Sequence, residues 1–526
     1  MRYFNTVGPC DPDLHYMLSA EERLPSAQEY FEFGFYFIVH APRQSGKTTA
    51  LLGMARELTA EGHFLALSVS CESVSTYGDD FAGLEVALLV LIAETARRQR
   101  WTPDLLPPED WEHSGAPGIR LSAGLAAWVA KCPRPLVLFF DEIDTLTGQG
   151  LISVLRQLRS GHTQYRKEFV HSVVLCGMRD IRDYKAASGG DPKRLGGPSP
   201  FNIVIESIRL GDFTKAEMKQ LYGQHTLETG QRFDDQAIDL AFWYTQGQPW
   251  LVNALAWQII GKMRVRETIT IDHVEEAKER LILARATHLD SLIDKLNDPR
   301  IQRVLEPIIT GGVRIPRSDF DDDTTYAKDL GLIAPGKQLR IANPIYQEVI
   351  VRVLGASAES AVTAQPAGFR FPDGRIDFPL LLQEFSTFWI QHGDILAKRD
   401  NYHEAAAQLV LMAFLHRIVN GQGFVEREVG VGRGRIDLLI RQPYSDAVGK
   451  RHEQREALEL KVWAGHQADP LADGLAQLDS YLDRLTLDTG TLIIFDRRPT
   501  APPIAQRTGF DKAQTPAGRT VTLLRA

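Results

Sequence analysis

The feature that most constrains this chain is the stretch of residues 36–49, where an apolar run is followed by Arg43-Gln44-Ser45-Gly46-Lys47-Thr48-Thr49. Aromatic and β-branched residues in the run predict a buried strand, and a helix is expected to start at Thr48. A loop between such elements aims backbone N–H groups and a helix N-terminus at one point, which forms an anion site. The stretch therefore predicts a phosphate-binding loop.

The residue types in the loop suit a nucleoside triphosphate. Lys47 supplies a flexible positive charge for the β- and γ-phosphates, and the Thr48 hydroxyl is suited to bind Mg²⁺. One departure from the pattern G-x-x-x-x-G-K-[ST] is Ala41, which stands where the first glycine belongs. Gly46, whose backbone must come closest to phosphate, is present. The nucleotide-contacting residues that we expect are Arg43, Gln44, Ser45, Gly46, Lys47, Thr48 and Thr49.

A second motif supplies the acids that such a site needs. Residues 135–144 form a continuous apolar run that ends in Asp141, Glu142 and Asp144, which predicts a buried parallel strand with carboxylates at its C-terminal edge. Asp141 would belong to the Mg²⁺ shell, and Glu142 would orient and deprotonate the attacking water. A strand ending in a solvated acidic turn is the alternative, and the phosphate loop argues against it.

Three neighbouring features leave alternatives open. Arg179 follows a predicted strand at 172–177, where it could sense the γ-phosphate or form a surface salt bridge. The loop 182–200 could carry an arginine finger for a neighbouring subunit, contact DNA, or be a mobile loop. The first 30 residues could cover an adenine or pack as a simple arm.

Composition limits the setting of the protein. A chain of 526 residues has room for three or four domains, and a net charge of −8 means that nucleic-acid binding must come from local basic patches. The four cysteines are scattered, which argues against a zinc site or a disulfide framework and suits a reducing cytoplasm. Without a signal-peptide core or an apolar run of membrane length, we expect a cytoplasmic protein with no membrane partner.

Further patterns continue the first half of the chain. From residue 214 the pattern is helical and is broken by the turn Gly247-x-Pro249, and helices with a short hairpin at 332–341 suggest a winged helix. With these features, residues 30–350 resemble P-loop ATPases of the AAA+/STAND group, close to the archaeal-type ATPases. The motifs that carry the resemblance are residues 41–49, the run ending at 141–144, the strand end at Arg179, the Gly247-x-Pro249 turn and the helix start Asn343-Pro344-Ile345-Tyr346.

The resemblance implies ATP hydrolysis coupled to movement of a helical lid, and often oligomerisation. In such proteins a winged helix is a DNA reader or an inter-domain packing unit. The acidic run at 320–323 would repel phosphates and favours packing here.

The last third of the chain carries another set of acids. Asp437 stands in a predicted strand with apolar neighbours, and Glu459 and Lys461 share one face of a predicted strand at 457–463. Burying two carboxylates together is costly unless a cation compensates, so a shared Mg²⁺ or Mn²⁺ is expected. Lys461 would then steady or deprotonate the attacking water, and Glu404 could join through water.

This arrangement resembles the PD-(D/E)XK nuclease superfamily over about residues 376–526. Two departures are Ile436, in place of a proline, and the long polar insert at 441–456 between the strands. Four arginines could contact phosphate or form a solvated basic turn: Arg427, Arg433, Arg435 and Arg441. In the resemblance, Asp437 is the motif aspartate, Glu459 and Lys461 are the E-x-K pair, Glu404 is the first-helix glutamate, and Gln477 with Tyr481 matches the Q-x-x-x-Y element of the branch with RecB-like nucleases.

The sequence thus predicts an α/β multidomain protein: a P-loop parallel αβα sandwich with a helical lid and winged helix, then a restriction-endonuclease-like α/β domain. Its expected function is that of an ATPase that regulates or drives a Mg²⁺-dependent nuclease, with ATP and possible further copies of itself as partners. The nuclease resemblance implies DNA, rather than RNA, as the substrate. The alternatives are a nucleotide-dependent switch or scaffold that binds nucleic acid or a partner without cleaving, and a DNA translocase. The expected segments are an arm (1–30), the ATPase core (31–212), the lid (213–299), the winged-helix-like region (300–353), a small-residue linker (354–375) and the nuclease-like domain (376–526).

Overall fold

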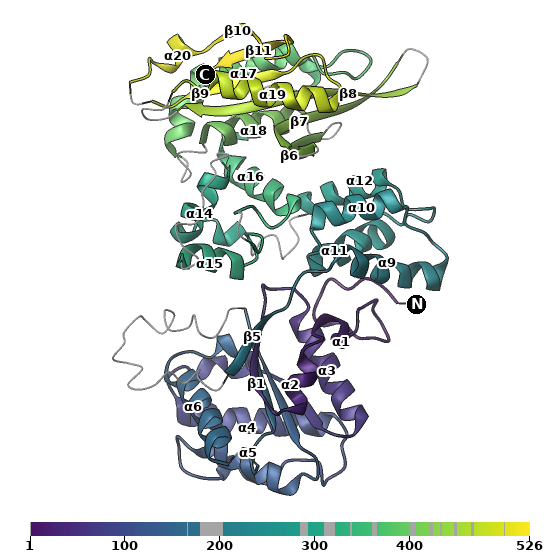
Figure 1. The fold of residues 1–526 in the computed structure, drawn as a ribbon, viewed down its shortest axis with the longest axis vertical. Coiled ribbons are helices and arrows are strands. Elements are labelled where there is room, and N and C mark those ends of the chain that lie inside the picture. Colours follow the sequence, from purple (N-terminus) through teal and green to yellow (C-terminus); the bar gives the residue numbers. More distant parts are fainter. Residues whose placement is uncertain are drawn as a thin grey trace. The chain divides into compact units, whose positions relative to one another are not determined.

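The computed structural model describes residues 2–165, 167–178, 204–284, 293–309, 321–336, 339–359, 366–399, 406–419, 424–431, 434–446, 450–463, 468–498 and 500–526. The chain forms two compact units (Figure 1). The first comprises Met1–His288, Thr325–Pro335 and Ala342–Pro344, and the second comprises Leu289–Thr324, Gly336–Ile341 and Ile345–Ala526. The region predicted as a winged helix is therefore divided between the two units, while the other domain limits stay predictions.

A five-stranded parallel sheet forms the centre of the first unit, in the order β2-β3-β4-β1-β5. The four strands expected from the sequence are present. The fifth, β5, was not predicted, because it is an edge strand that has no fully buried residue and forms no continuous apolar run. The strands are β1 (Tyr36–His40), β2 (Leu65–Ser70), β3 (Leu136–Asp141), β4 (Ser172–Gly177) and β5 (Val204–Arg209).

Helices cover both faces of this sheet, which confirms the predicted αβα sandwich. One buried cluster joins a sheet face to α1 (Ala20–Arg23), α2 (Ala27–Glu32) and α3 (Lys47–Glu61). The cluster on the opposite face involves α4 (Phe81–Arg98), α5 (Arg120–Lys131) and α6 (Gly148–Tyr165). Short 3₁₀ helices lie at η1 (Glu72–Tyr77), η2 (Trp111–His113) and η3 (Ile143–Thr145).

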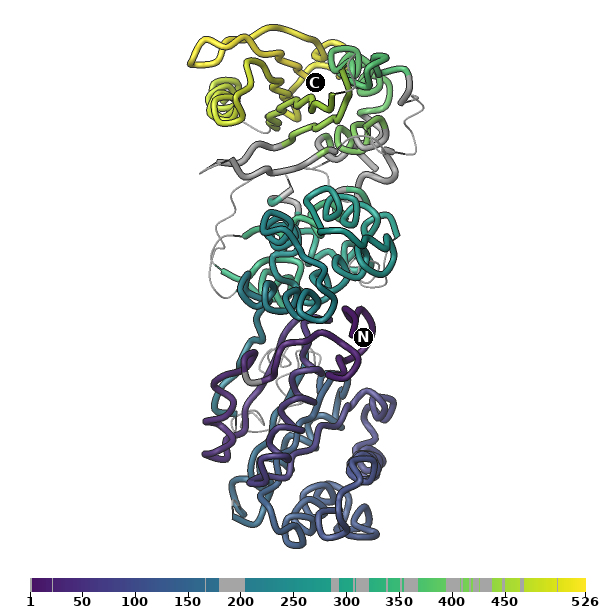
Figure 2. The backbone as a smooth tube through the Cα atoms, turned by 90° about the vertical axis from the view of Figure 1, so that its right-hand side faces the viewer, coloured from purple at the N-terminus to yellow at the C-terminus, as the bar shows by residue number. Residues whose placement is uncertain are grey.

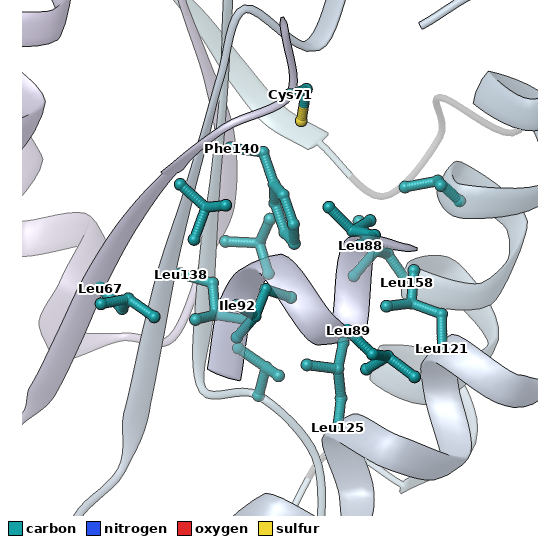
Figure 3. Close-up of a cluster of buried hydrophobic side chains, with 14 of the residues drawn as sticks. Leu67, Cys71, Leu88, Leu89, Ile92, Leu121, Leu125, Leu138, Phe140 and Leu158 are labelled. Carbon is teal, nitrogen blue, oxygen red and sulfur yellow. The ribbon is translucent and has the colours of Figure 1, made fainter. Parts of the chain in front are cut away.

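The second of these clusters fixes the strand that carries the acids. Figure 3 shows Leu88 and Ile92 of α4 facing Leu138 and Phe140 of β3. All four side chains are at most 1% exposed. Burying an aliphatic or aromatic side chain of this size contributes roughly 1.5–3 kcal/mol, so the cluster anchors the end of β3 firmly.

A buried acid ties the helices of this face together. Glu85 of α4 is fully buried and accepts hydrogen bonds from the Gly118 backbone N–H (3.1 Å to each oxygen), the Ser153 hydroxyl (2.9 Å) and the Gln157 amide (2.7 Å). Because each donor is matched to the carboxylate, the acid is tolerated in the core. Glu85 therefore acts as a structural cross-link.

The rest of the first unit is a helical layer with the N-terminal arm packed on it (Figure 2). The arm is held by a Trp250 Nε1–H bond to the Thr6 oxygen (2.9 Å) and by a hydrogen bond between Tyr16 and His225 (3.2 Å). Thr214 caps the first helix with a reciprocal capping box. The helices are α9 (Lys215–Thr229), α10 (Asp235–Thr245), α11 (Pro249–Trp257), which continues as the π-helical turn η5 (Gln258–Lys262), and α12 (Ile271–Leu283).

The second unit contains a mixed six-stranded sheet in the order β10-β11-β9-β8-β7-β6. Strands β8, β9 and β11 run parallel, and the remaining pairs are antiparallel. The strands are β6 (Phe424–Val431), β7 (Gly434–Ser445), β8 (Arg451–Trp463), β9 (Thr491–Asp496), β10 (Gly509–Gln514) and β11 (Thr520–Arg525). The helical elements from residue 299 onward are α14 (Pro299–Ile309), α15 (Asp322–Asp329), α16 (Pro344–Glu359), η6 (Pro366–Phe369), α17 (Phe378–Arg399), α18 (Ala406–Val419), α19 (Leu471–Leu485) and α20 (Ile504–Arg507).

The structure corrects three details of the sequence analysis. The predicted polar insert at 441–456 is instead a paired hairpin, with register from Arg441↔Arg455 to Ser445↔Arg451. The predicted linker begins inside α16, because alanine, serine and glutamate are compatible with a helix. In the predicted 332–341 hairpin, the described residues form a bridge, with the Ala342 N–H bonded to the Leu332 oxygen (2.8 Å), rather than two strands.

Candidate nucleotide site and a second acidic centre

The loop between β1 and α3 has the shape expected of a phosphate-binding loop. Gly46 adopts φ +86° at the N-cap of α3, and no atom would obstruct a Cβ there, so glycine is required for its conformation rather than for space. The Ser45 hydroxyl donates to the Pro42 oxygen at 2.8 Å and fixes the turn. Arg43 and Gln44 are exposed at its tip. The first backbone N–H groups of α3 therefore face the end of the loop, where they can bind an anion.

Lys47 lies over this loop. Its ammonium donates to the Ala41 and Pro42 oxygens, both at 2.8 Å. Burial lowers the pKa of Lys47, while nearby acids, Asp141 among them, oppose that effect. An anionic ligand at the loop would favour the charged lysine in the same way, so the lysine is suited to neutralise a phosphate.

The two predicted halves of the site meet at Thr48 and Asp141. The Thr48 hydroxyl donates to Asp141 Oδ2 at 2.6 Å, and the Glu142 backbone N–H donates to Asp141 Oδ1 at 3.0 Å. Asp141 is only 2% exposed. A hydroxyl and a carboxylate oxygen thus lie side by side at the N-terminus of α3, and both are ligand types that Mg²⁺ prefers.

Glu142 stands in an unusual backbone conformation just beyond β3. Its φ is +53°, in the left-handed region that is uncommon for residues other than glycine. Ser70, at the end of β2, donates its hydroxyl to Glu142 Oε2 at 2.8 Å. Burial raises the pKa of Glu142, as do the charges of Glu72 and Asp141, while the Ser70 hydrogen bond lowers it. A glutamate with a raised pKa is a better proton acceptor than an ordinary one.

Several neighbours complete this edge of the sheet. Asp144 accepts a hydrogen bond from the Met178 backbone N–H at 3.0 Å, which ties the acidic strand end to the end of β4. Thr49 Oγ1 accepts from the Cys10 N–H at 3.0 Å and joins the arm to α3. Arg179 and the loop 182–200 lie outside the described residues, so their predicted roles stay predictions.

A cavity of about 500 Å³ opens beside the loop, which is a volume typical of small-molecule sites. Its wall combines loop residues with the N-terminal arm and the helical layer, and most of the wall away from the loop is apolar. Representative lining residues are Gly46, Val7, Leu18, Phe213, Trp250 and Asn253. The sequence had left the arm's role open, and only the fold brings residues 5–18 to this place.

The predicted Gly247-x-Pro249 turn contacts the loop. Gln248 caps α11 by accepting from the Leu251 N–H, and its amide nitrogen donates to the Gln44 oxygen at 3.3 Å. Gly247 has φ +78°, and a Cβ at this position would lie 1.8 Å from the Phe213 oxygen. Glycine is therefore required here, and the turn before α11 joins the helical layer to the phosphate loop.

The second unit brings three predicted residues together. Glu459 of β8 is 2% exposed, and Lys461 donates to its Oε1 at 2.7 Å. The Lys461 ammonium also donates to the side-chain oxygen of Gln477 on α19. Gly474 lets α19 approach closely, since a Cβ there would lie 2.8 Å from Leu492 and 3.4 Å from the Lys461 side chain.

The other predicted residues of this centre are described less fully. Tyr481 packs with the cluster between α19 and the sheet. The backbone of Asp437 lies in β7 next to Leu438, which pairs with Leu458, the residue before Glu459. Nothing is described for Glu404 or for the Asp437 side chain. Of the four arginines, the side chain described is that of Arg441, which pairs with Glu453 at 2.7 Å.

Metal clusters, membrane-spanning helices and disulfides are absent from the described part of the chain. Within the ranges given above, no group of three or more His, Cys, Asp and Glu side chains is arranged to hold a metal ion. None of the helices in the described part of the chain is both long and apolar enough to cross a membrane. The four cysteines form no disulfide.

No protein-family model and no curated protein sequence matches this chain. Among solved structures, it is similar to the Walker-type ATPase PABY2304 of Pyrococcus abyssi, with 14% identity, a TM-score of 0.47 and coverage of 66% of this chain and 99% of that one. It is also similar to Aeropyrum pernix Orc1 in complex with DNA (12% identity, TM-score 0.35, covering 65% and 94%). A third similar structure is the Thermotoga maritima RuvB Holliday junction branch migration motor, with 15% identity, a TM-score of 0.33 and coverage of 63% of this chain and 92% of that one. At these values, the function of this chain has to be inferred from its own residues.

Proposed function

We propose that the first unit binds and hydrolyses ATP with Mg²⁺. The observation that carries this proposal is the contact between Thr48 and Asp141, 2.6 Å apart, at the N-terminus of the helix that follows the phosphate loop. The loop, the lysine and the acids come from two separate strands, and a chance Gly-Lys-Thr sequence would not bring them together. The cavity beside the loop has room for the nucleoside.

The residues fit Mg²⁺ by chemistry and position. Thr48 and Asp141 would hold the ion, which when bound would neutralise charge on the phosphates. The Lys47 ammonium, which here donates to the Ala41 and Pro42 oxygens, would instead donate to the β- and γ-phosphates of bound ATP. Glu142 accepts a proton from the attacking water, with Ser70 restraining its carboxylate.

We further propose that the second unit is a metal-dependent DNA nuclease. The support is the cluster of Glu459, Lys461 and Gln477, in which a buried carboxylate meets a lysine and an amide from another element. Glu459 would supply one oxygen ligand for Mg²⁺ or Mn²⁺, and Asp437, the residue before Leu438 in the neighbouring strand β7, would supply another. Lys461 holds or deprotonates the water that attacks phosphorus.

In this proposal, ATP turnover in the first unit governs cleavage by the second. The test is a cleavage assay on circular and linear DNA, with Mg²⁺ or Mn²⁺ and with or without ATP. We expect Lys47→Ala to abolish ATP turnover and change cleavage, and Glu459→Gln or Asp437→Ala to abolish cleavage while leaving ATP turnover intact. Lys219→Ala and Asp483→Asn, at exposed side chains that form ion pairs, are the matched controls for charge loss in the first and second units and should behave as wild type.

The assay also separates the rival functions. A nucleotide-dependent switch or scaffold predicts ATP binding and no metal-dependent cleavage by the wild type. A translocase predicts ATP turnover strongly stimulated by long DNA. If Lys47→Ala changed neither ATP turnover nor cleavage, the coupled mechanism would be wrong.

A further inference from the structure

The tip of the phosphate loop has a backbone conformation that needs support. Gln44 adopts φ +58°, in the left-handed region that residues with a Cβ rarely occupy. Such a conformation persists only where the surrounding structure holds it. Gln44 also lines the nucleotide cavity together with Ser45 and Gly46, so its conformation affects the part of the loop that a ligand meets.

A glutamine of the helical layer contacts this residue. The Gln248 side-chain Nε2 donates to the Gln44 main-chain oxygen at 3.3 Å, and its Oε1 accepts from the Leu251 N–H at 2.6 Å. Because a main-chain N–H only donates, the amide oxygen must face Leu251, and the nitrogen is left to face Gln44. The contact therefore joins a donor to a carbonyl oxygen, and a flipped amide would break both hydrogen bonds.

The backbone that carries the Gln248 side chain is itself fixed. The Gln248 N–H donates to the Thr245 oxygen at 3.0 Å, and the Gly247 oxygen accepts from the Phe213 N–H at 2.8 Å. Gln248 is buried and is not among the residues that line the cavity. It is therefore placed to act on a ligand through the loop rather than by touching the ligand.

We propose that Gln248 is a positioning residue whose amide holds Gln44 in the left-handed conformation and so keeps the phosphate loop in the shape that receives the triphosphate. This inference rests on the proposed ATP site and adds the residue that links the helical layer to it. A loop that already has its bound shape loses less conformational freedom when the ligand arrives, so affinity is gained without a contact to the ligand. Without the Gln248 donor, Gln44 would be free to relax, and part of the affinity for the phosphates would be lost.

The test measures how tightly the full-length protein binds ATP and adenosine, by competition with a fluorescent ATP analogue in the presence of Mg²⁺. Gln248→Met keeps the length of the side chain and removes the donor. We expect this variant to bind ATP about fivefold more weakly and adenosine as tightly as wild type does, because the loop meets the phosphates and the apolar wall meets the nucleoside. A role confined to capping α11, which supplies part of that wall, would weaken both ligands alike.

A double-mutant cycle with Gln44→Gly tests the route of the effect. Glycine adopts a positive φ without strain, so the loop would no longer depend on the Gln248 donor. In the Gln44→Gly background we expect Gln248→Met to change the affinity for ATP by less than about twofold, against about fivefold in the wild-type background. The same factor in both backgrounds would show that the two residues act independently, and it would overturn the proposal.

The matched control is Thr214→Val, which removes the N-cap of another helix in the same layer, where the Thr214 hydroxyl accepts from the Glu217 N–H at 3.2 Å. It should bind ATP as wild type does. Unchanged affinity for ATP in Gln248→Met, or an equal loss for adenosine, would overturn the proposal while leaving the ATP site intact. Failure of wild type to bind ATP would overturn the proposed ATPase as well.

A second variant covers the case in which Gln248→Met does not fold. Gln248→Glu keeps the acceptor for the Leu251 N–H but has no donor for the Gln44 oxygen. The repulsion between its charge and the phosphates is the same in both backgrounds of the cycle, so the cycle with Gln44→Gly would still decide.

Discussion

Replacing Thr48 by valine tests the contact that carries the proposed ATPase. Valine keeps the shape of threonine but removes the hydroxyl that donates to Asp141 Oδ2 at 2.6 Å. Asp141 is almost fully buried and would keep the Glu142 N–H as its remaining donor in this group of contacts. A hydrogen bond to a buried charged group contributes about 2 kcal/mol, so we expect a loss of stability of that size in the first unit.

The same change should act on Mg²⁺, since the hydroxyl is also a proposed ligand. We expect ATP turnover by Thr48→Val to require at least tenfold more Mg²⁺ for half-maximal rate, measured by phosphate release at saturating ATP. Urea unfolding followed by circular dichroism measures the stability change. Thr59→Val is the matched control, because it removes a hydroxyl near the other end of the same helix, where Thr59 is hydrogen-bonded to the Ala66 backbone, and it should leave the Mg²⁺ requirement unchanged. A Thr48→Val protein with wild-type stability and wild-type Mg²⁺ dependence would refute the reasoning.

Three further changes probe the surrounding structure. Ser70→Ala removes the bond that lowers the pKa of Glu142, so that pKa should rise and the acid limb of the pH–rate profile of ATP turnover should move to higher pH; an unmoved limb would show that Glu142 is not the base. Gly247→Ala should lower the melting temperature and weaken ATP binding, because its Cβ would strike Phe213; unchanged values in both assays would contradict the observed turn. Glu85→Leu leaves three donor groups without their acceptor and should lower the free energy of unfolding, measured with urea, by about 3 kcal/mol. An unchanged free energy of unfolding would show that these hydrogen bonds do not stabilise the fold.

Much of the first unit was readable from local sequence. Apolar runs before Gly46 and before Asp141 predicted two buried parallel strands, and the structure has both; the helix expected from Thr48 starts one residue earlier, at Lys47. The edge strand β5 was missed, since a half-exposed strand carries no continuous apolar run. In the second unit, the hairpin of β7 and β8 was taken for a polar insert, because its outer part is solvated and its pairing is set by register rather than by hydrophobicity.

The sequence by itself determined the chemistry that each motif can offer: an anion site at the loop, carboxylates at a strand end, and a lysine two residues from a glutamate. These follow from spacing along the chain, because turns, helix starts and strand alternation are local. Only the tertiary structure decided which distant groups meet. Ser70 reaches Glu142, and the arm reaches the nucleotide cavity, because the packing of separate elements brings them together. Contacts of this kind depend on the fold as a whole, and no local pattern encodes them.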